Sequence, residues 1–274
     1  MGRTLEKVKQ CADCGVDAIN IPDGPRASSR LSPLIAALKI KEDCDIEPIL
    51  HICCRDRNII ALQSDLLGLE TMDLHNVLLI TGDPPKLGEF PDATGVFDLD
   101  SVALTAIAAN LNRGIDIVGN EFSPAVSLTL GVGANPVASE IHREIDRFKQ
   151  KARAGAEYAV TQPVFDTEMF FSFQAEVEDS GLPIVAGIWP FTSYKNAEFM
   201  ANEVPGVMVP KKILDRMAGA KTKSEGRAEG IKIAREMMEE ISGHIAGFAV
   251  SAPFGNVNIA LAVLGKMSIE EASK

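Results

Sequence analysis

The chain has 274 residues, of which 46% are hydrophobic and 24% are charged, so it can bury the core of one large domain or two modest ones. This composition excludes the collagen-like and intrinsically disordered classes. The formal net charge is −11, and so acidic a chain repels a phosphate backbone. We therefore expect no nucleic-acid partner, and we expect any anionic ligand to be held by local donors.

The sequence carries no sign of a membrane or secretory segment. No apolar run approaches the roughly 20 residues that a membrane span needs. The start, MGRTLEKVKQC, lacks the apolar centre of a signal peptide. Five cysteines (11, 14, 44, 53 and 54) in such a chain indicate reduced thiols and a cytoplasmic protein. Adjacent strand residues point to opposite faces, so we interpret the cysteines as small buried side chains and expect no metal site.

Short β-branched runs alternate with amphipathic stretches along the chain. The predicted strands are 17–23, 47–54, 76–82, 125–132, 157–163, 183–190 and 247–254. Most of these runs are almost continuously apolar, which is typical of parallel strands covered by helices on both faces.

Helical spacing of apolar residues predicts helices between these strands. The clearest cover 5–12, which ends before Gly15, and 104–111, which ends before Gly114. Another is expected around 31–38, and its predicted buried face is Leu31, Leu34, Ile35 and Leu38. Thr222-x-x-Glu225 is a candidate capping box for a last long helix.

Regular βα alternation in one domain favours an α/β fold, either a (β/α)8 TIM barrel or an open doubly wound sheet. No G-x-G-x-x-G follows the first strand, which weakens the dinucleotide-binding open sheet. We therefore predict a TIM barrel spanning 1–274 as a single domain. Only seven strands are readable and a helix comes first, so we expect the first barrel strand to be missing from this chain.

Polar residues gather at the predicted strand ends, where a βα barrel places its active site. Asp83 lies between a glycine and two prolines, and is either a turn cap or a rigidly held carboxylate. Gln162 offers an amide donor and acceptor to a ligand or to a neighbouring loop. His51 is a core residue or a site residue, and Lys151 lies on a solvated helix face or reaches a phosphate. Residues 55–57 are a solvated charge cluster or, as we favour, the start of a helix.

The sequence contains no nucleophile elbow, metal-ligand pattern or P-loop. The strand ends carry amides, carboxylates and a histidine, but no obvious covalent nucleophile. This inventory suits chemistry carried by an organic cofactor that the protein positions and polarises.

Taken in order, five segments resemble one enzyme family. They are HICCRDRN (51–58), LLITGDPP (78–85), ANP (134–136), KARAGAEYAVTQPVFD (151–166) and GIWPFTSYKNAEF (187–199). Together they resemble methylenetetrahydrofolate reductase, in particular the reductase half of bifunctional homocysteine methyltransferase/reductase proteins. The resemblance runs from about residue 5 to residue 265.

This resemblance implies a barrel that holds FAD and reduces 5,10-methylenetetrahydrofolate to 5-methyltetrahydrofolate, with NADH or NADPH as the electron donor. It places Asp83 beside the flavin and the folate pterin as a catalytic residue. It places Gln162 on the substrate, also as a catalytic residue, with Lys195 and Phe199 binding the substrate. The positions that match flavin binding are Asp23, His51, Thr81, Gly82, Asp83, Gly131, Asn135, Ala138, Glu144 and Lys151.

Some positions depart from the family pattern. Thr81 stands where some relatives have arginine, and Asn135 where some have histidine. The resemblance places the family's general-acid glutamate on the first strand, which we expect to be missing, so we expect this chain by itself to be nearly inactive as a reductase.

Two other functions stay open beside the reductase: a non-catalytic or partner-dependent barrel that binds folate or flavin, and a pterin or folate methyltransferase. A flavin spectrum would distinguish them. The resemblance also implies a homo-oligomer, and either a partner electron carrier or a fused methyltransferase domain.

Overall fold

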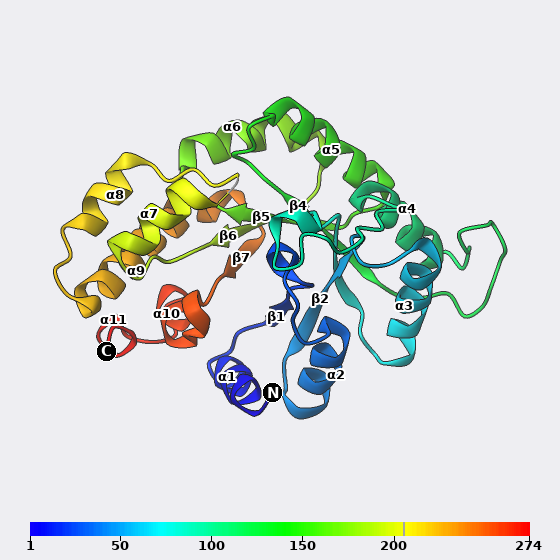
Figure 1. The fold of residues 1–274 in the computed structure, drawn as a ribbon, viewed down its shortest axis with the longest axis horizontal. Coiled ribbons are helices and arrows are strands. Elements are labelled where there is room, and N and C mark those ends of the chain that lie inside the picture. Colours follow the sequence, from blue (N-terminus) through cyan, green and yellow to red (C-terminus); the bar gives the residue numbers. More distant parts are fainter. Residues whose placement is uncertain (205) are drawn as a thin grey trace. The chain divides into compact units, whose positions relative to one another are not determined.

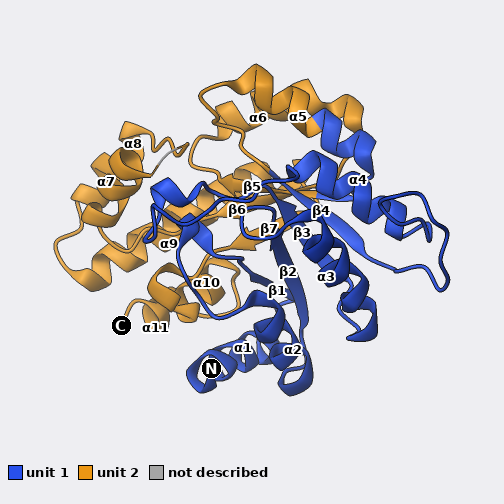
Figure 2. Cartoon of the chain, turned by 45° about the vertical axis from the view of Figure 1, so that its right-hand side comes forward, with its two compact units in different colours: residues 1–133, 149–158 blue, residues 134–148, 159–274 orange. Residues whose placement is uncertain are grey.

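The computed structural model describes residues 1–204 and 206–274. The chain forms two compact units, one of residues 1–133 and 149–158 and the other of residues 134–148 and 159–274 (Figure 2). In both units, short strands alternate with helices along the chain (Figure 1). A single domain over the whole chain stays a prediction.

Unit 1 contains the first four strands, which pair in parallel and in chain order. Its elements are α1 (Gly2–Asp13), β1 (Ala18–Ile21), η1 (Pro25–Ala27), α2 (Pro33–Asp43), β2 (Glu47–Cys53), α3 (Ile59–Thr71), β3 (Asn76–Ile80), η2 (Pro85–Leu87), α4 (Ser101–Leu111) and β4 (Thr129–Ala134). The last residue of β4 already belongs to unit 2, as do the first eight residues of α5 (Ile141–Ala154).

The core of unit 1 lies between its strands and the helices that cover them. Leu62, Leu66 and Leu69 recur at helical spacing on α3 and are fully buried, as are Leu79 of β3 and Leu104 of α4. Each of these side chains contributes on the order of 1.5–3 kcal/mol by leaving water. The side chain of Asn58 caps α3 by accepting a hydrogen bond from the backbone N–H of Ala61 (2.9 Å). Burial and capping together fix the start of α3, which follows β2 after the loop of residues 54–58.

Unit 2 holds the last three strands, again parallel and in chain order. Its elements are β5 (Tyr158–Pro163), α6 (Thr167–Val177), η3 (Glu178–Ser180), β6 (Ile184–Ile188), α7 (Tyr194–Glu203), α8 (Lys211–Ala218), α9 (Lys223–Ile241), η4 (Ser242–His244), β7 (Gly247–Val250), η5 (Pro253–Gly255), α10 (Val257–Val263) and α11 (Ile269–Ala272). The strand β5 has an irregular register between Val160 and Pro163, just before its end.

Unit 2 has its own aromatic core. The rings of Phe165 and Phe191 stack with their centroids 4.8 Å apart, and Met217 and Ile233 pack into the same cluster. The expected capping box forms at the start of α9. The Thr222 side chain accepts a hydrogen bond from the backbone N–H of Glu225, and the Glu225 side chain accepts one from the backbone N–H of Thr222.

The parallel strands and alternating helices are those of a (β/α) barrel of the TIM type, and they confirm the expected fold class. Seven strands occur in the part of the chain that the structure describes, and a helix comes first, as the sequence analysis expected. The strand expected over 125–132 is shifted, because β4 begins at Thr129.

The predicted buried face of the second helix is wrong. Helix α2 buries Pro33, Ala37 and Ile40, whereas Leu31 and Ile35 are more than half exposed. The helix begins at Pro33, after Leu31, so Leu31 lies in the preceding loop. The helix contacts β2, and the residues that it buries recur at helical spacing as Pro33, Ala37 and Ile40. Two large apolar side chains are therefore left on the surface.

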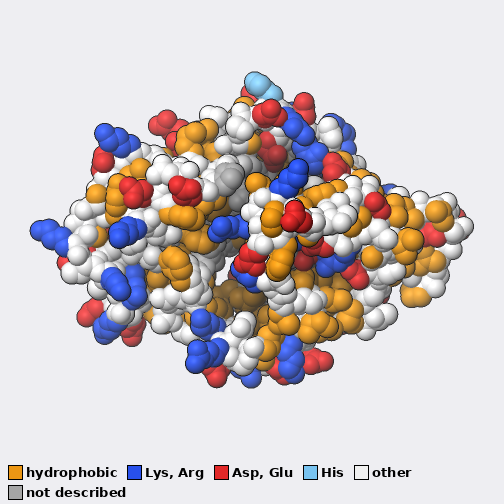
Figure 3. Space-filling model, viewed as in Figure 1, with side chains coloured by type: hydrophobic (Ala, Val, Ile, Leu, Met, Phe, Trp, Pro, Cys, Tyr) orange, Lys and Arg blue, Asp and Glu red, His pale blue; other side chains and the backbone are white. Residues whose placement is uncertain are grey.

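Within the described residues, no helix is long and apolar enough to cross a membrane. The face seen in Figure 3 intersperses acidic and basic side chains, with apolar ones between them. This face therefore has no extended basic patch, and an anion could bind there only through individual hydrogen-bond donors.

Candidate functional site

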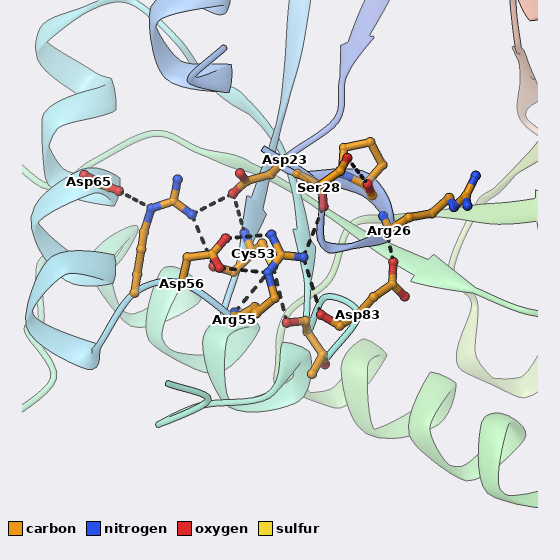
Figure 4. Close-up of polar contacts among 12 residues, drawn as sticks. Asp23, Arg26, Ser28, Cys53, Arg55, Asp56, Asp65 and Asp83 are labelled. Carbon is orange, nitrogen blue, oxygen red and sulfur yellow. Dashed lines mark hydrogen bonds and ion pairs between the residues drawn. The ribbon is translucent and has the colours of Figure 1, made fainter. Parts of the chain in front are cut away.

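The loops that follow β1, β2 and β3 in unit 1 carry a network of charged side chains (Figure 4). Asp23, after β1, is only 6% exposed. Its Oδ2 accepts hydrogen bonds from the backbone N–H of Cys53 (3.0 Å) and from Nη1 of Arg57 (2.6 Å). Arg57 also pairs with Asp65 through Nε (2.9 Å). Asp23 thus joins the end of β1 to the end of β2 through a buried ion pair.

Arg55 is the second organising residue of this network, and it is only 4% exposed. Its guanidinium binds the carboxylate of Asp56 in a bidentate manner (2.8 and 2.6 Å). Nη1 also donates to the carbonyl oxygens of Gly24 (3.1 Å) and Asp83 (3.4 Å). One side chain from the β2 loop therefore fixes the backbone of the two neighbouring loops.

The Asp83 side chain is exposed. Its Oδ2 accepts a hydrogen bond from the backbone N–H of Arg26 (3.0 Å). The donating loop is strained, since Arg26 and Ala27 adopt the left-handed region at φ 58° and 49°. A strained loop held in this way aims a backbone donor at the carboxylate and fixes its orientation.

The residue before Asp83 must be glycine. Gly82 has φ 89°, and a Cβ there would lie 2.1 Å from Sγ of Cys53. Its neighbour Thr81 is half-buried, and its hydroxyl accepts a hydrogen bond from the backbone N–H of Ser101 (3.0 Å) at the start of α4. The turn that carries Asp83 is therefore tied both to β2 and to α4.

His51 lies inside β2, where its ring nitrogen Nε2 contacts Oδ1 of Asn20 (3.1 Å). Burial lowers the pKa of His51 to about 4. The imidazole is therefore neutral at pH 7, when it can donate through one ring nitrogen and accept through the other.

Gly131 and Lys151 also belong to unit 1. Gly131 is buried in β4, where a Cβ would overlap the ring of Tyr158. Lys151, on α5, is 5% exposed, and its Nζ donates to the carbonyl oxygen of Gly133 (2.8 Å). The solvated-face alternative for Lys151 is therefore wrong, because its ammonium reaches inward to the end of β4.

Three other flavin-binding candidates come together in unit 2, where β4 leads into α5. Oε1 of Glu144 accepts a hydrogen bond from the backbone N–H of Asn135 (3.0 Å). The carbonyl of Asn135 accepts one from the backbone N–H of Ala138 (3.2 Å), and its Nδ2 donates to the carbonyl oxygen of Gly206 (3.3 Å). The loop between β4 and α5 is therefore held by hydrogen bonds to Glu144 of α5 and to the backbone of Gly206.

The substrate-binding candidates lie on two other segments of unit 2. Gln162 lies next to the last residue of β5, and its side chain is exposed. Lys195 and Phe199 stand one turn apart on α7, and both are exposed, with Phe199 at 45%.

Sequence reasoning missed the two arginines that organise Asp83. We expected 55–57 to begin a helix, but α3 begins at Ile59, and Arg55 is buried in the network. Arg26 was not singled out at all. Its contribution is a backbone N–H in a left-handed conformation, which side-chain identity does not reveal.

The donor set fits a flavin nucleotide. Lys151 supplies a buried ammonium of the kind that binds phosphate, and neutral His51 can donate to or accept from a heterocycle edge. In the described parts of the chain, no three His, Cys, Asp or Glu side chains gather as they would around a metal ion.

A family model described as methylenetetrahydrofolate reductase matches residues 3–250. A relative from Oryza sativa subsp. japonica, named as a probable methylenetetrahydrofolate reductase (NADH), is 26% identical over 86% of this chain and 40% of its own length. One from Arabidopsis thaliana, named methylenetetrahydrofolate reductase (NADH) 1, is 27% identical over 88% of this chain and 41% of its own. The chain thus spans about two fifths of the length of these relatives.

A solved structure has the same fold over almost the whole chain. It is an uncharacterized protein from Clostridium thermocellum, whose description states that it binds two copies of 5-methyl-5,6,7,8-tetrahydrofolic acid. The TM-score is 0.65 at 17% identity, over 99% of this chain and 88% of that one.

Proposed function

Because this chain belongs to the methylenetetrahydrofolate reductase family, we propose that it reduces 5,10-methylenetetrahydrofolate to 5-methyltetrahydrofolate with FAD as its cofactor. The family match over residues 3–250 is the observation that carries the proposal. NADH or NADPH is the proposed electron donor, and the two plant relatives carry NADH in their names. FAD, when bound, supplies the hydride-transfer chemistry.

Asp83 is the proposed catalytic carboxylate. It is exposed at the end of β3, and its orientation is fixed by the Arg26 backbone N–H and by the rigid Gly-Asp-Pro-Pro turn. A preoriented negative charge stabilises positive charge that develops on a bound substrate, such as the iminium form of a folate. The Arg55 guanidinium pairs with the Asp56 carboxylate and donates to the carbonyl oxygen of Asp83.

Substrate binding is assigned to unit 2. Gln162 would hydrogen-bond the pterin through its amide, and Phe199 would stack on a flat part of the ligand. Lys195, on the same helix, adds a positive charge for an anionic substrate.

The proposed flavin contacts in unit 1 are His51, Thr81, Gly82 and Gly131, with Lys151 providing positive charge for the phosphates. In unit 2, the proposed flavin contacts are Asn135, Ala138 and Glu144. Assembly into a homo-oligomer belongs to the same proposal.

The test is the spectrum of the purified protein followed by its two half-reactions. We expect bound flavin, its reduction by NADH or NADPH, and its reoxidation by 5,10-methylenetetrahydrofolate, each followed by stopped flow. Asp83→Asn should keep the flavin and slow the folate half-reaction by roughly tenfold or more, while flavin reduction changes little.

Asp13→Asn is the matched control, because Asp13 is an exposed carboxylate at the end of α1, a helix that carries none of the proposed site residues. It should leave both half-reactions unchanged. Protein that takes up no flavin would refute the proposal, and bound pterin without flavin would favour the methyltransferase. Equal half-reaction rates for Asp83→Asn and the parent would refute the role of Asp83.

A further inference from the structure

Two cysteines of unit 1 share one turn at the end of α1, and the proposed function uses neither of them. Cys11 lies inside the helix, and Cys14 is the residue that caps its C-terminal end. All five cysteines fall within the described residues as free thiols, and all except Cys14 are buried. Cys14 is therefore an exception to the burial expected from the sequence, and this partly exposed thiol lies three residues from a buried one.

Backbone hydrogen bonds hold this turn in one conformation. The N–H of Gly15 donates to the carbonyl oxygen of Ala12 (2.8 Å), and the N–H of Val16 donates to that of Cys11 (3.1 Å). With Gly15 at φ 71°, these two bonds form the Schellman motif that commonly ends a helix. Cys11 and Cys14 thus belong to one ordered turn, which keeps them close to each other.

The spacing of the two residues is compatible with a disulfide. Helix geometry places Cα atoms three residues apart at about 5 Å, inside the range of roughly 4.4–6.8 Å that disulfides span. Their Cβ atoms start about 5–6 Å apart and must approach by roughly 1–2 Å. Cys14 can supply this movement, because it caps the helix and its ψ of 3° already departs from the helical value.

The two thiols also interact electrostatically. Burial raises the pKa of Cys11, and the nearby Cys14 raises it further. The second contribution exists only while Cys14 can carry a negative charge. Once Cys14 is held in a neutral mixed disulfide, that contribution is lost and Cys11 ionises more readily. The partly exposed Cys14 is therefore the thiol that reacts first, and the buried Cys11 reacts second.

We propose that Cys11 and Cys14 are a redox-active dithiol that forms an intramolecular disulfide by exchange with a low-molecular-weight disulfide. The Cys14 thiolate attacks one sulfur of the oxidant, whose S–S bond breaks and releases one thiolate. The Cys11 thiolate then attacks the Cys14 sulfur and releases the second thiolate. The two protein thiols are oxidised, the oxidant is reduced to two thiols, and the two protons lost by the cysteines pass to these products. Reduction by an external dithiol reverses the exchange.

Peptide mapping of the full chain tests the site, because trypsin leaves both cysteines in one peptide, residues 10–26. The folded protein is incubated with glutathione disulfide, and the remaining thiols are alkylated in denaturant. We expect this peptide to carry no alkyl group and to be two hydrogens lighter than its reduced form, and dithiothreitol should restore both thiols. Alkylation of both Cys11 and Cys14 after oxidation, or linkage of either to another cysteine, would overturn the proposal. No flavin or folate takes part, so the outcome does not depend on the proposed function.

Two substitutions separate the roles of the two thiols. Cys11→Ser removes the second thiol and should trap glutathione on Cys14 as a stable mixed disulfide. Cys14→Ser removes the accessible thiol and should slow the reaction with glutathione disulfide by about tenfold or more, because the remaining cysteines are buried. The proposal is refuted if Cys11→Ser accumulates no mixed disulfide, or if Cys14→Ser reacts as fast as the parent.

Cys44→Ser is the matched control. Cys44 is buried against another part of α1, where its Sγ lies 3.9 Å from the carbonyl oxygen of Leu5. It should leave the formation of the disulfide unchanged. Loss of the disulfide in Cys44→Ser would show that Cys44 takes part in the exchange and would contradict the assignment to Cys11 and Cys14.

Discussion

The buried ion pair between Asp23 and Arg57 should hold the loops of unit 1 in place, and Asp23→Asn tests this. The two groups are 2.6 Å apart, with side-chain exposures of 7% and 22%. The substitution removes the charge that balances Arg57 and weakens the acceptor of the Cys53 backbone N–H. Breaking a buried pair on one side typically costs 3–5 kcal/mol. Arg57 is partly exposed and keeps Asp65 at 2.9 Å, so we expect about 2–3 kcal/mol.

Urea unfolding at pH 7 measures this loss, and a double-mutant cycle with Arg57→Gln isolates the pair. We expect a coupling free energy of about 1–3 kcal/mol. Asp65→Asn is the control, because Asp65 binds the same guanidinium but is 37% exposed, and it should cost less than about 1 kcal/mol. A coupling below about 0.5 kcal/mol, or equal losses for Asp23→Asn and Asp65→Asn, would refute the reasoning.

Three further predictions concern other parts of the chain. The pKa of His51 is about 4 in the folded chain and about 6.5 when unfolded. The stability that the neutral ring contributes is therefore fully present above pH 6.5 and is lost as the pH falls to 4, by about 3 kcal/mol. The free energy of unfolding, measured with urea between pH 4 and 7.5, should depend less steeply on pH in His51→Gln. Gly230→Ala should lower the free energy of unfolding by about 1–3 kcal/mol and so lower the melting temperature, because the new Cβ would overlap the carbonyl oxygen of Phe191. Gly243→Ala is the control and should change the melting temperature little, because the space around Gly243 is open. Gln162→Leu should weaken folate binding by roughly 1–3 kcal/mol if its amide contacts the pterin, and a titration that shifts less than twofold would contradict that role.

The sequence by itself determined the alternation of strands and helices and most of their positions. The apolar runs that predict β1, β2 and β3 give strands within a few residues of their expected bounds, because burial on both faces leaves a continuous signal. The capping box at Thr222 formed as predicted, since its two hydrogen bonds join residues only three apart. Asp83 could be singled out for the same local reason, as its glycine and prolines already specify a rigid turn at the strand end.

The tertiary structure alone decided what surrounds Asp83. Arg55 is buried because the loops after β1 and β3 offer carbonyl oxygens to its guanidinium, and those loops lie 28 to 31 residues away in sequence. The Arg26 backbone N–H reaches Asp83 across 57 residues, from a left-handed conformation that no periodicity encodes. The exposure of Ile35 likewise depends on which face of α2 packs inward. Local patterns specify elements, whereas partners distant in the chain specify the loop conformations that place the charges, and only the folded chain brings those partners together.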